Sequence, residues 1–186
     1  MRNPVKGKVK TRIAQSLGDD KALLIYKILL EHTQYITQHI ECAKYVFYAD
    51  NINEYDGWLS DIYHRAIQSN GDLGNKMSKA FEQIFNTGAT QAIIIGSDCY
   101  DLRAVDIEKA FDLLAEADIV IGPASDGGYY LLGMKIHQPA LFENISWSTA
   151  LVLQETLGIC TQQGLKYILL PVLNDVDEEK DINFEY

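Results

Sequence analysis

The sequence has few cysteines, no long apolar run and no overall excess of positive charge, and each of these absences excludes a class of protein. Its 186 residues include only Cys42, Cys99 and Cys160, which are too few and too far apart for a disulfide framework or a closely spaced zinc site. No apolar run approaches the ~20 residues that a membrane-spanning helix needs. The N-terminus is basic but lacks the apolar stretch of a signal peptide, and we expect a cytoplasmic protein.

The charge is acidic overall but unevenly distributed. The formal net charge is -10 at pH 7, which argues against a nucleic-acid partner. Residues 2–12, here called the basic loop, contain no acidic residue and five of the 16 basic residues of the chain: Arg2, Lys6, Lys8, Lys10 and Arg12. This loop is either a local anion-binding site or a solvated basic terminus. It lacks the G-x-x-x-x-G-K-[ST] spacing, which excludes a P-loop NTPase.

Helical and strand-like segments alternate along the chain. Two continuous apolar runs, residues 93–95 and 119–121, are typical of strands buried on both faces of a parallel sheet. We therefore predict a three-layer α/β/α protein with a mainly parallel sheet, formed by one domain over residues 1–186. The expected helices cover residues 20–38, 73–85, 105–117 and 149–163, and the expected strands cover residues 44–49, 63–68, 91–96, 118–122, 129–134 and 166–172.

In such sheets, ligands bind beyond the carboxyl ends of strands, so the residues that follow each apolar run carry the functional information. Asp98 follows the run at residues 93–95. Its carboxylate can bind Mg²⁺ or Mn²⁺, or it can simply cap the next helix. Asp175 and Asp177 follow the last expected strand and could supply a second metal ligand, although an acidic, solvated tail is the commoner outcome for such a run.

The segment Asp126-Gly127-Gly128 follows the run at residues 119–121. Asp-Gly-Gly is strong turn chemistry, and a turn alone explains it. A functional interpretation makes Asp126 a hydroxyl-binding or general-base carboxylate, with the glycines leaving room for a ligand beside the backbone. Two further segments have structural interpretations. Residues 71–74 are either a glycine-rich contact to a ligand or the N-cap region of a helix. Residues 147–149 are a core anchor followed by a helix cap at Thr149.

These segments together resemble the bacterial selenodomain-associated transferase family, first described beside radical-SAM genes. That family belongs to the GT-A-like superfamily of glycosyltransferases and nucleotidyltransferases. The resemblance runs from Arg2 to about Ile182 and rests on six motifs in the same order. The motifs are Asn3-Pro4-x-x-Gly7-Lys8-Val9-Lys10-Thr11-Arg12, Gln68-x-x-Gly71-Asp72-Leu73-Gly74-x-x-Met77, Gly96-Ser97-Asp98-Cys99, Gly122-Pro123-Ala124-x-Asp126-Gly127-Gly128-Tyr129-Tyr130-Leu131-x-Gly133, Trp147-Ser148-Thr149 and Asp175-Val176-Asp177-x-x-x-Asp181.

The resemblance implies a GT-A-like fold and a role for each motif. Lys10 and Arg12 would bind a nucleotide diphosphate. Asp98 would be the metal-binding, catalytic aspartate, and Asp177, or less favourably Asp175, would complete the site for Mg²⁺ or Mn²⁺. The other implied roles are nucleotide binding by Gly71, Asp72 and Gly74, acceptor binding by Gly127, Gly128, Tyr129 and Trp147, and base catalysis by Asp126.

The function that the resemblance implies is a metal-dependent transferase that uses a nucleotide-sugar donor and a small-molecule acceptor. A nucleotidyltransferase acting on a phosphorylated acceptor is the first alternative, and a non-catalytic nucleotide-binding or partner-binding module is the second. Three departures bear on the choice. Tyr100 stands where the family has proline, and Lys76 stands where it has arginine. Only Met1 to Asn3 precede Pro4, where the family has its first strand, so we expect either a missing first strand or a truncated sequence.

Overall fold

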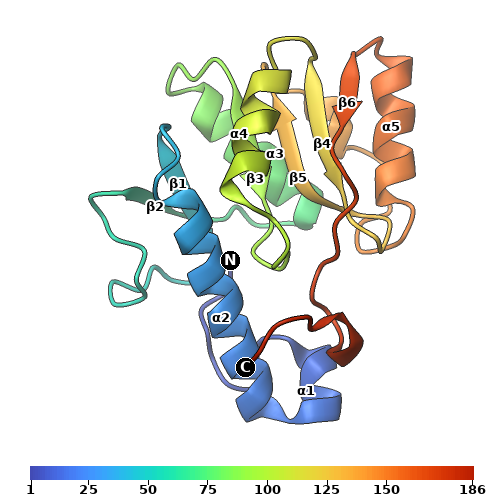
Figure 1. Cartoon of the computed structure of the whole chain (residues 1–186). Helices are drawn as coiled ribbons and strands as arrows, with labels where there is room; N and C mark the ends of the chain where they lie inside the picture. Colours follow the sequence, from blue (N-terminus) through green and yellow to red (C-terminus); the bar gives the residue numbers. More distant parts are fainter. The chain divides into compact units, whose positions relative to one another are not determined.

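The computed structural model describes all of residues 1–186, and its elements can be followed in Figure 1. The chain divides into two compact units. Unit 1 comprises residues 1–68, 97–104 and 174–186, and unit 2 comprises residues 69–96 and 105–173. None of the helices combines the length and the apolar character that crossing a bilayer requires.

Unit 1 is organised around its longest helix, α2 (Asp19–Thr37). Gly18, at φ 84°, separates α2 from the short helix α1 (Thr11–Leu17), and two aspartates in the first turn of α2 complement the positive end of the helix dipole. Ala22, Ile25 and Leu29 recur at helical spacing and pack against α1 and residues 174–186, here called the C-terminal segment. Tyr26 and Leu30, on the adjoining face, pack against the two strands of this unit.

Those two strands are β1 (Lys44–Tyr48) and β2 (Tyr63–Ile67), which pair in parallel. No strand precedes the basic loop. Met1 alone pairs with the other edge of β1, since its amino group donates to Phe47 O (2.6 Å) and its carbonyl accepts from Ala49 N (2.8 Å). The C-terminal segment contains the 3-10 turn η2 (Glu179–Asp181), which Figure 1 shows in dark red beside α1.

Unit 2 contains a four-stranded sheet in the order β3-β5-β4-β6. These strands are β3 (Ala92–Ile95), β4 (Ile119–Pro123), β5 (Tyr129–Met134) and β6 (Tyr167–Leu169). Strands β3, β4 and β6 run in the same direction, as predicted, whereas β5 runs antiparallel to both of its neighbours. Strand β4 is buried along its whole length, which confirms the inference from its continuous apolar run.

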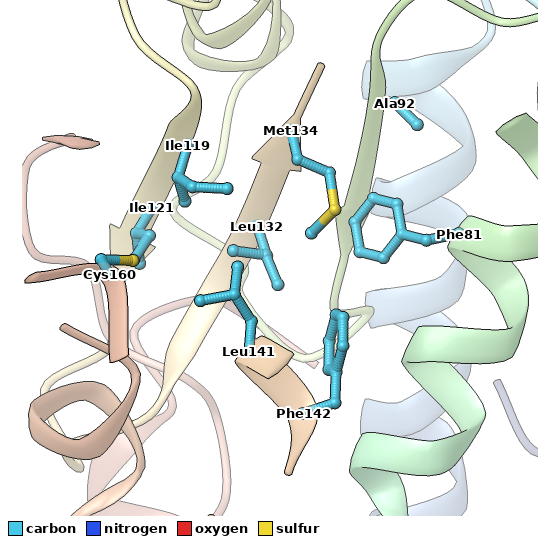
Figure 2. Packing of buried hydrophobic residues seen from close by; sticks show 9 residues of the cluster. All are labelled: Phe81, Ala92, Ile119, Ile121, Leu132, Met134, Leu141, Phe142 and Cys160. Atoms are coloured by element: carbon cyan, nitrogen blue, oxygen red, sulfur yellow. The ribbon is translucent and has the colours of Figure 1, made fainter. Parts of the chain in front are cut away.

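Helices cover both faces of this sheet. Figure 2 shows the core on one face, where Leu132 and Met134 of β5 meet Phe81 of α3 (Leu73–Phe85) and Leu141 of the 3-10 helix η1 (Pro139–Phe142). Helix α5 (Val152–Gln162) contributes Cys160 to the same cluster. On the opposite face, Gly133 lies against Leu114, just beyond α4 (Ala104–Leu113). This is the three-layer arrangement that the sequence predicted.

Candidate functional site

Asp98 lies in the loop that follows β3, and its backbone is held by the C-terminal segment. Its carbonyl oxygen accepts a hydrogen bond from the Val176 N–H (2.8 Å), and Val176 is itself buried against α1 and α2. The next residue, Cys99, is buried as well, and burial followed by the charge of Asp175 raises the pKa of its thiol to about 12. These contacts hold the backbone from which the Asp98 carboxylate projects.

Lys10 places its ammonium group between two carboxylates that are far apart in the sequence. Its Nζ atom lies 2.8 Å from Oδ1 of Asp98 and 3.3 Å from Oδ1 of Asp177. The Lys10 side chain is only 6% exposed, whereas those of Asp98 and Asp177 are 41% and 43% exposed. Oδ1 of Asp98 is a buried atom without a hydrogen bond of ordinary geometry, so the ammonium is what balances its charge.

The backbone of Lys10 is in the left-handed region, at φ 45° and ψ 49°. This conformation costs a residue with a Cβ atom roughly 1–2 kcal/mol. Non-glycine residues keep it only where the surrounding structure imposes it. Lys10 combines this strained backbone, at the start of α1, with the two ion pairs of its side chain.

Asp177 has a second cationic partner and a fixed backbone. Arg12 Nη1 lies 3.3 Å from its Oδ2. The carboxylate of Asp181 accepts hydrogen bonds from the N–H groups of Asp177 (3.2 Å) and Glu178 (2.8 Å), which caps the η2 turn. The structure thus brings together four of the residues that the resemblance implied, Lys10, Arg12, Asp98 and Asp177, which are here called the acid–base cluster.

Sequence reasoning missed Tyr26, which anchors the basic loop behind this cluster. Its hydroxyl accepts a hydrogen bond from Arg2 N (3.1 Å) and donates one to Arg2 O (2.9 Å). Burial, with a smaller contribution from the charge of Asp98, raises the pKa of Tyr26 to about 12. In the sequence Tyr26 is simply one more large residue on the buried face of a helix, and no pattern marks its hydroxyl.

Tyr100, the departure from the family's proline, has a structural role in this loop. Its ring centroid lies 4.0 Å from that of Phe184 and 4.6 Å from that of His32. His32 also contacts the carbonyl oxygen of Leu102 through Nε2 at 2.9 Å. Aromatic packing against the C-terminal segment therefore restrains the loop where a proline would have stiffened it.

The two carboxylates of the acid–base cluster could hold a divalent metal whose other ligands come from water and substrate phosphates. The structure contains no group of three His, Cys, Asp or Glu side chains placed to hold a metal. Two carboxylates, from Asp98 and Asp177, do converge on one cationic nitrogen. Mg²⁺ in proteins commonly takes one or two carboxylates and completes its shell with water and substrate phosphates. The donor set therefore suits such an ion, with two protein carboxylates as ligands.

In unit 2, the turn chemistry of Asp126-Gly127-Gly128 accounts for the sequence found there. Oδ1 of Asp126 accepts a hydrogen bond from Gly128 N (2.8 Å), and Gly127 has φ 91°. A Cβ atom on Gly127 would lie 2.3 Å from the carbonyl oxygen of Ala150. The space beside Gly127 is thus occupied by the protein's own backbone, not by room for a ligand.

The start of α3 has similar structural explanations. Asp72 is the N-cap, and its carboxylate accepts a hydrogen bond from Asn75 N (2.8 Å). Gly71 has φ 112°, which favours glycine. Gly74 is buried beneath Trp147, and a Cβ atom added there would lie 2.3 Å from the indole Nε1. Residues predicted to bind a nucleotide and an acceptor, Gly74 and Trp147, are therefore in contact with each other.

We expect the Gly74→Ala substitution to destabilise unit 2 by about 1–3 kcal/mol, because the new methyl group overlaps the indole of Trp147. Displacement of the indole should also shift its fluorescence maximum to the red. Urea denaturation measures the first effect, and emission spectra in a Trp58→Phe background, where Trp147 is the remaining tryptophan, measure the second. A variant with wild-type stability and an unchanged spectrum would contradict this contact.

Two other predicted residues lie differently from expectation. Tyr129 packs against the core of unit 2 and its hydroxyl is buried, and burial raises its pKa well above the usual range. Thr149, predicted as an N-cap, lies in a turn ahead of α5, and Leu151 is the N-cap residue. The Thr149 hydroxyl instead donates a hydrogen bond to Ser146 O (2.7 Å) and accepts one from Leu151 N (3.2 Å).

Comparison with known proteins adds a family and a related structure. Residues 33–149 match the family described as "Uncharacterized protein conserved in bacteria (DUF2064)". No curated protein matches the chain. Among solved structures, the crystal structure of a "putative nucleotide-diphospho-sugar transferase" from Desulfovibrio desulfuricans G20 is 32% identical, with a TM-score of 0.89. The similarity covers 96% of this chain and 80% of that one, and it agrees with the predicted GT-A-like fold.

Proposed function

The chain belongs to the DUF2064 family of bacterial proteins, and from that premise we propose that it is a metal-dependent transferase whose donor is a nucleotide-diphospho-sugar. The observation that carries the proposal is the acid–base cluster of unit 1. Two cationic side chains and two carboxylates converge there. Similarity to the Desulfovibrio protein, described as a nucleotide-diphospho-sugar transferase, supports the choice of donor.

A diphosphate needs positive charge from several directions, and this cluster can supply it. The Arg12 side chain is 66% exposed, and its planar guanidinium can donate bidentate hydrogen bonds to phosphate oxygens. Lys10 adds a compact ammonium group from within the loop. Asp98 and Asp177 would hold Mg²⁺ or Mn²⁺, and the ion would supply positive charge that stabilises the departing nucleoside diphosphate.

The experiment that tests this proposal is a thermal-shift panel with UDP, GDP, ADP, CDP and TDP, each with and without Mn²⁺. A ligand present at about 100 times its Kd stabilises the native state by about 2.7 kcal/mol, which corresponds to a rise in Tm of roughly 5 °C or more for a chain of this size. We expect one nucleotide to give such a shift only in the presence of metal. A folded protein that shows no shift with any nucleotide would refute the donor site.

A further inference from the structure

We propose that Lys10 is a displaceable internal cation, which occupies the position between Asp98 and Asp177 until a metal ion replaces it. The inference rests on the proposed metal-diphosphate site but assigns Lys10 a role beyond phosphate binding. In this role the ammonium and the metal compete for the same carboxylate oxygens. The free protein then binds metal weakly, and Lys10 has to leave the carboxylates before both can act as ligands.

The geometry supports direct competition. The same atom, Nζ of Lys10, contacts Oδ1 of both carboxylates, at 2.8 and 3.3 Å. These separations are those of an ion pair, and an ion inserted between the two oxygens would occupy the place that Nζ now fills. Arg12 contacts the other oxygen of Asp177, Oδ2, and so does not block that position.

The burial of the Lys10 ammonium makes its ion pairs with Asp98 and Asp177 energetically important. The ammonium is almost fully buried, while both carboxylates are partly open to solvent. A buried ammonium without a partner is costly, so Lys10 will not release the acids unless another anion accepts it. A diphosphate is such an anion, and Lys10 belongs to the one basic segment of the chain. Its strained left-handed backbone is a second reason to expect an alternative position for the side chain.

A thermodynamic consequence follows. If a diphosphate draws Lys10 away from Asp98 and Asp177, it raises the affinity of the carboxylates for metal. Reciprocity requires that metal then raises the affinity for the diphosphate by the same factor. The requirement for both ligands together, which the proposed function assumes, would arise within unit 1 from a single side chain.

The test measures Mn²⁺ binding in the absence of nucleotide, from the electron paramagnetic resonance signal of free Mn²⁺. We expect Lys10→Met to bind Mn²⁺ about tenfold more tightly than the wild type or better, because both carboxylates lose the ammonium that competes for their Oδ1 atoms. The matched control is Lys8→Met, which removes the same charge from the same loop at an exposed position and should behave as wild type. Adding Asp98→Asn to the Lys10→Met variant should abolish the gain.

A second readout is thermal stability. In EDTA, Lys10→Met should melt below the wild type because the facing carboxylates repel each other, and Mn²⁺ should restore its Tm while barely changing that of the wild type. Lys10→Gly, which also relieves the left-handed backbone, provides a second variant if the first folds poorly. Mn²⁺ affinities that are equal in the wild type and in the folded Lys10 variants, or no Mn²⁺ binding by any variant, would overturn the proposal.

Failure of this proposal can be told apart from failure of the proposed function. A nucleotide that stabilises the wild type with metal, together with Lys10 variants that bind Mn²⁺ no better, would leave the donor site standing and remove only the competition. Tighter Mn²⁺ binding by the Lys10 variants, with no thermal shift for any nucleotide, would support competition between Lys10 and the metal but refute nucleotide binding.

Discussion

The Asp98→Asn variant should lose metal-dependent nucleotide binding and at least about a hundredfold in turnover, while it remains folded. The amide keeps the shape of the carboxylate but removes the charge that attracts a divalent ion. Metal contributes several kcal/mol to the stabilisation of a transition-state charge, and each 1.36 kcal/mol corresponds to a factor of ten in rate. The measurements are the nucleotide thermal shift with Mn²⁺ and the release of nucleoside diphosphate from the sugar nucleotide that the panel identifies.

Folding should tolerate this change. The Asp98 backbone is held by the bond from Val176, which does not involve its side chain, and Lys10 keeps Asp177 as a partner. Asp112→Asn is the matched control, because it makes the same chemical change at an exposed position on α4. An Asp98→Asn variant that still shows the metal-dependent shift would exclude Asp98 from the site. A loss of both functions in the control would indicate an effect of net charge instead.

Local sequence patterns predicted the bounds of helices and strands best where a capping residue or a turn lies at the boundary. The bounds of α3 and β5 agree residue for residue with the expected segments 73–85 and 129–134. Asp72 caps the first and the glycine turn precedes the second, so each boundary has a chemical signal. Helix α5 lacks such a signal, and it begins three residues later than predicted because residues 148–150 form a turn, in which Ser148 has φ 64°.

The direction of β5 could have been deduced from the sequence. The turn at Asp126-Gly127-Gly128 connects β4 to β5 through five residues, 124–128. A parallel crossover needs a dozen residues or more, so a connection this short requires an antiparallel pair. The continuous apolar run of β4 indicated its burial on both faces correctly, whereas Ile93 to Ile95 of β3 are only partly buried. Neither run carries information on strand direction.

The acid–base cluster could not have been deduced from local patterns. Lys10, Asp98 and Asp177 are separated by tens of residues, and each is ambiguous in its own segment. The placement of Asp98 and Asp177 after strands and the order of six motifs suggested a shared site, and the GT-A-like fold supports the resemblance at the level of the superfamily. The narrower assignment to selenodomain-associated transferases stays a prediction. The glycines of unit 2 have two explanations, because close packing by the protein and close approach by a ligand both select glycine.

The strongest test of that last distinction is Gly127→Ala, which we expect to destabilise the protein by about 3 kcal/mol or more. Two costs combine at this position. The backbone has φ 91°, where a residue with a Cβ atom is strained, and the added methyl group would lie 2.3 Å from Ala150 O and 2.7 Å from Ala150 Cα. The turn cannot simply move away, because Gly127 O accepts a hydrogen bond from Leu153 N (2.9 Å) at the start of α5.

Gly158→Ala is the matched control, because the same methyl group is added to an exposed helical position of α5 where no atom lies within 4 Å of it. Alanine is favoured over glycine in a helix by roughly 0.5–1 kcal/mol, so this variant should be more stable than the wild type. Chemical denaturation of both variants thus yields changes in unfolding free energy of opposite sign. A Gly127→Ala variant within about 1 kcal/mol of the wild type would mean that Gly127 has free space beside it, as a glycine reserved for a ligand requires.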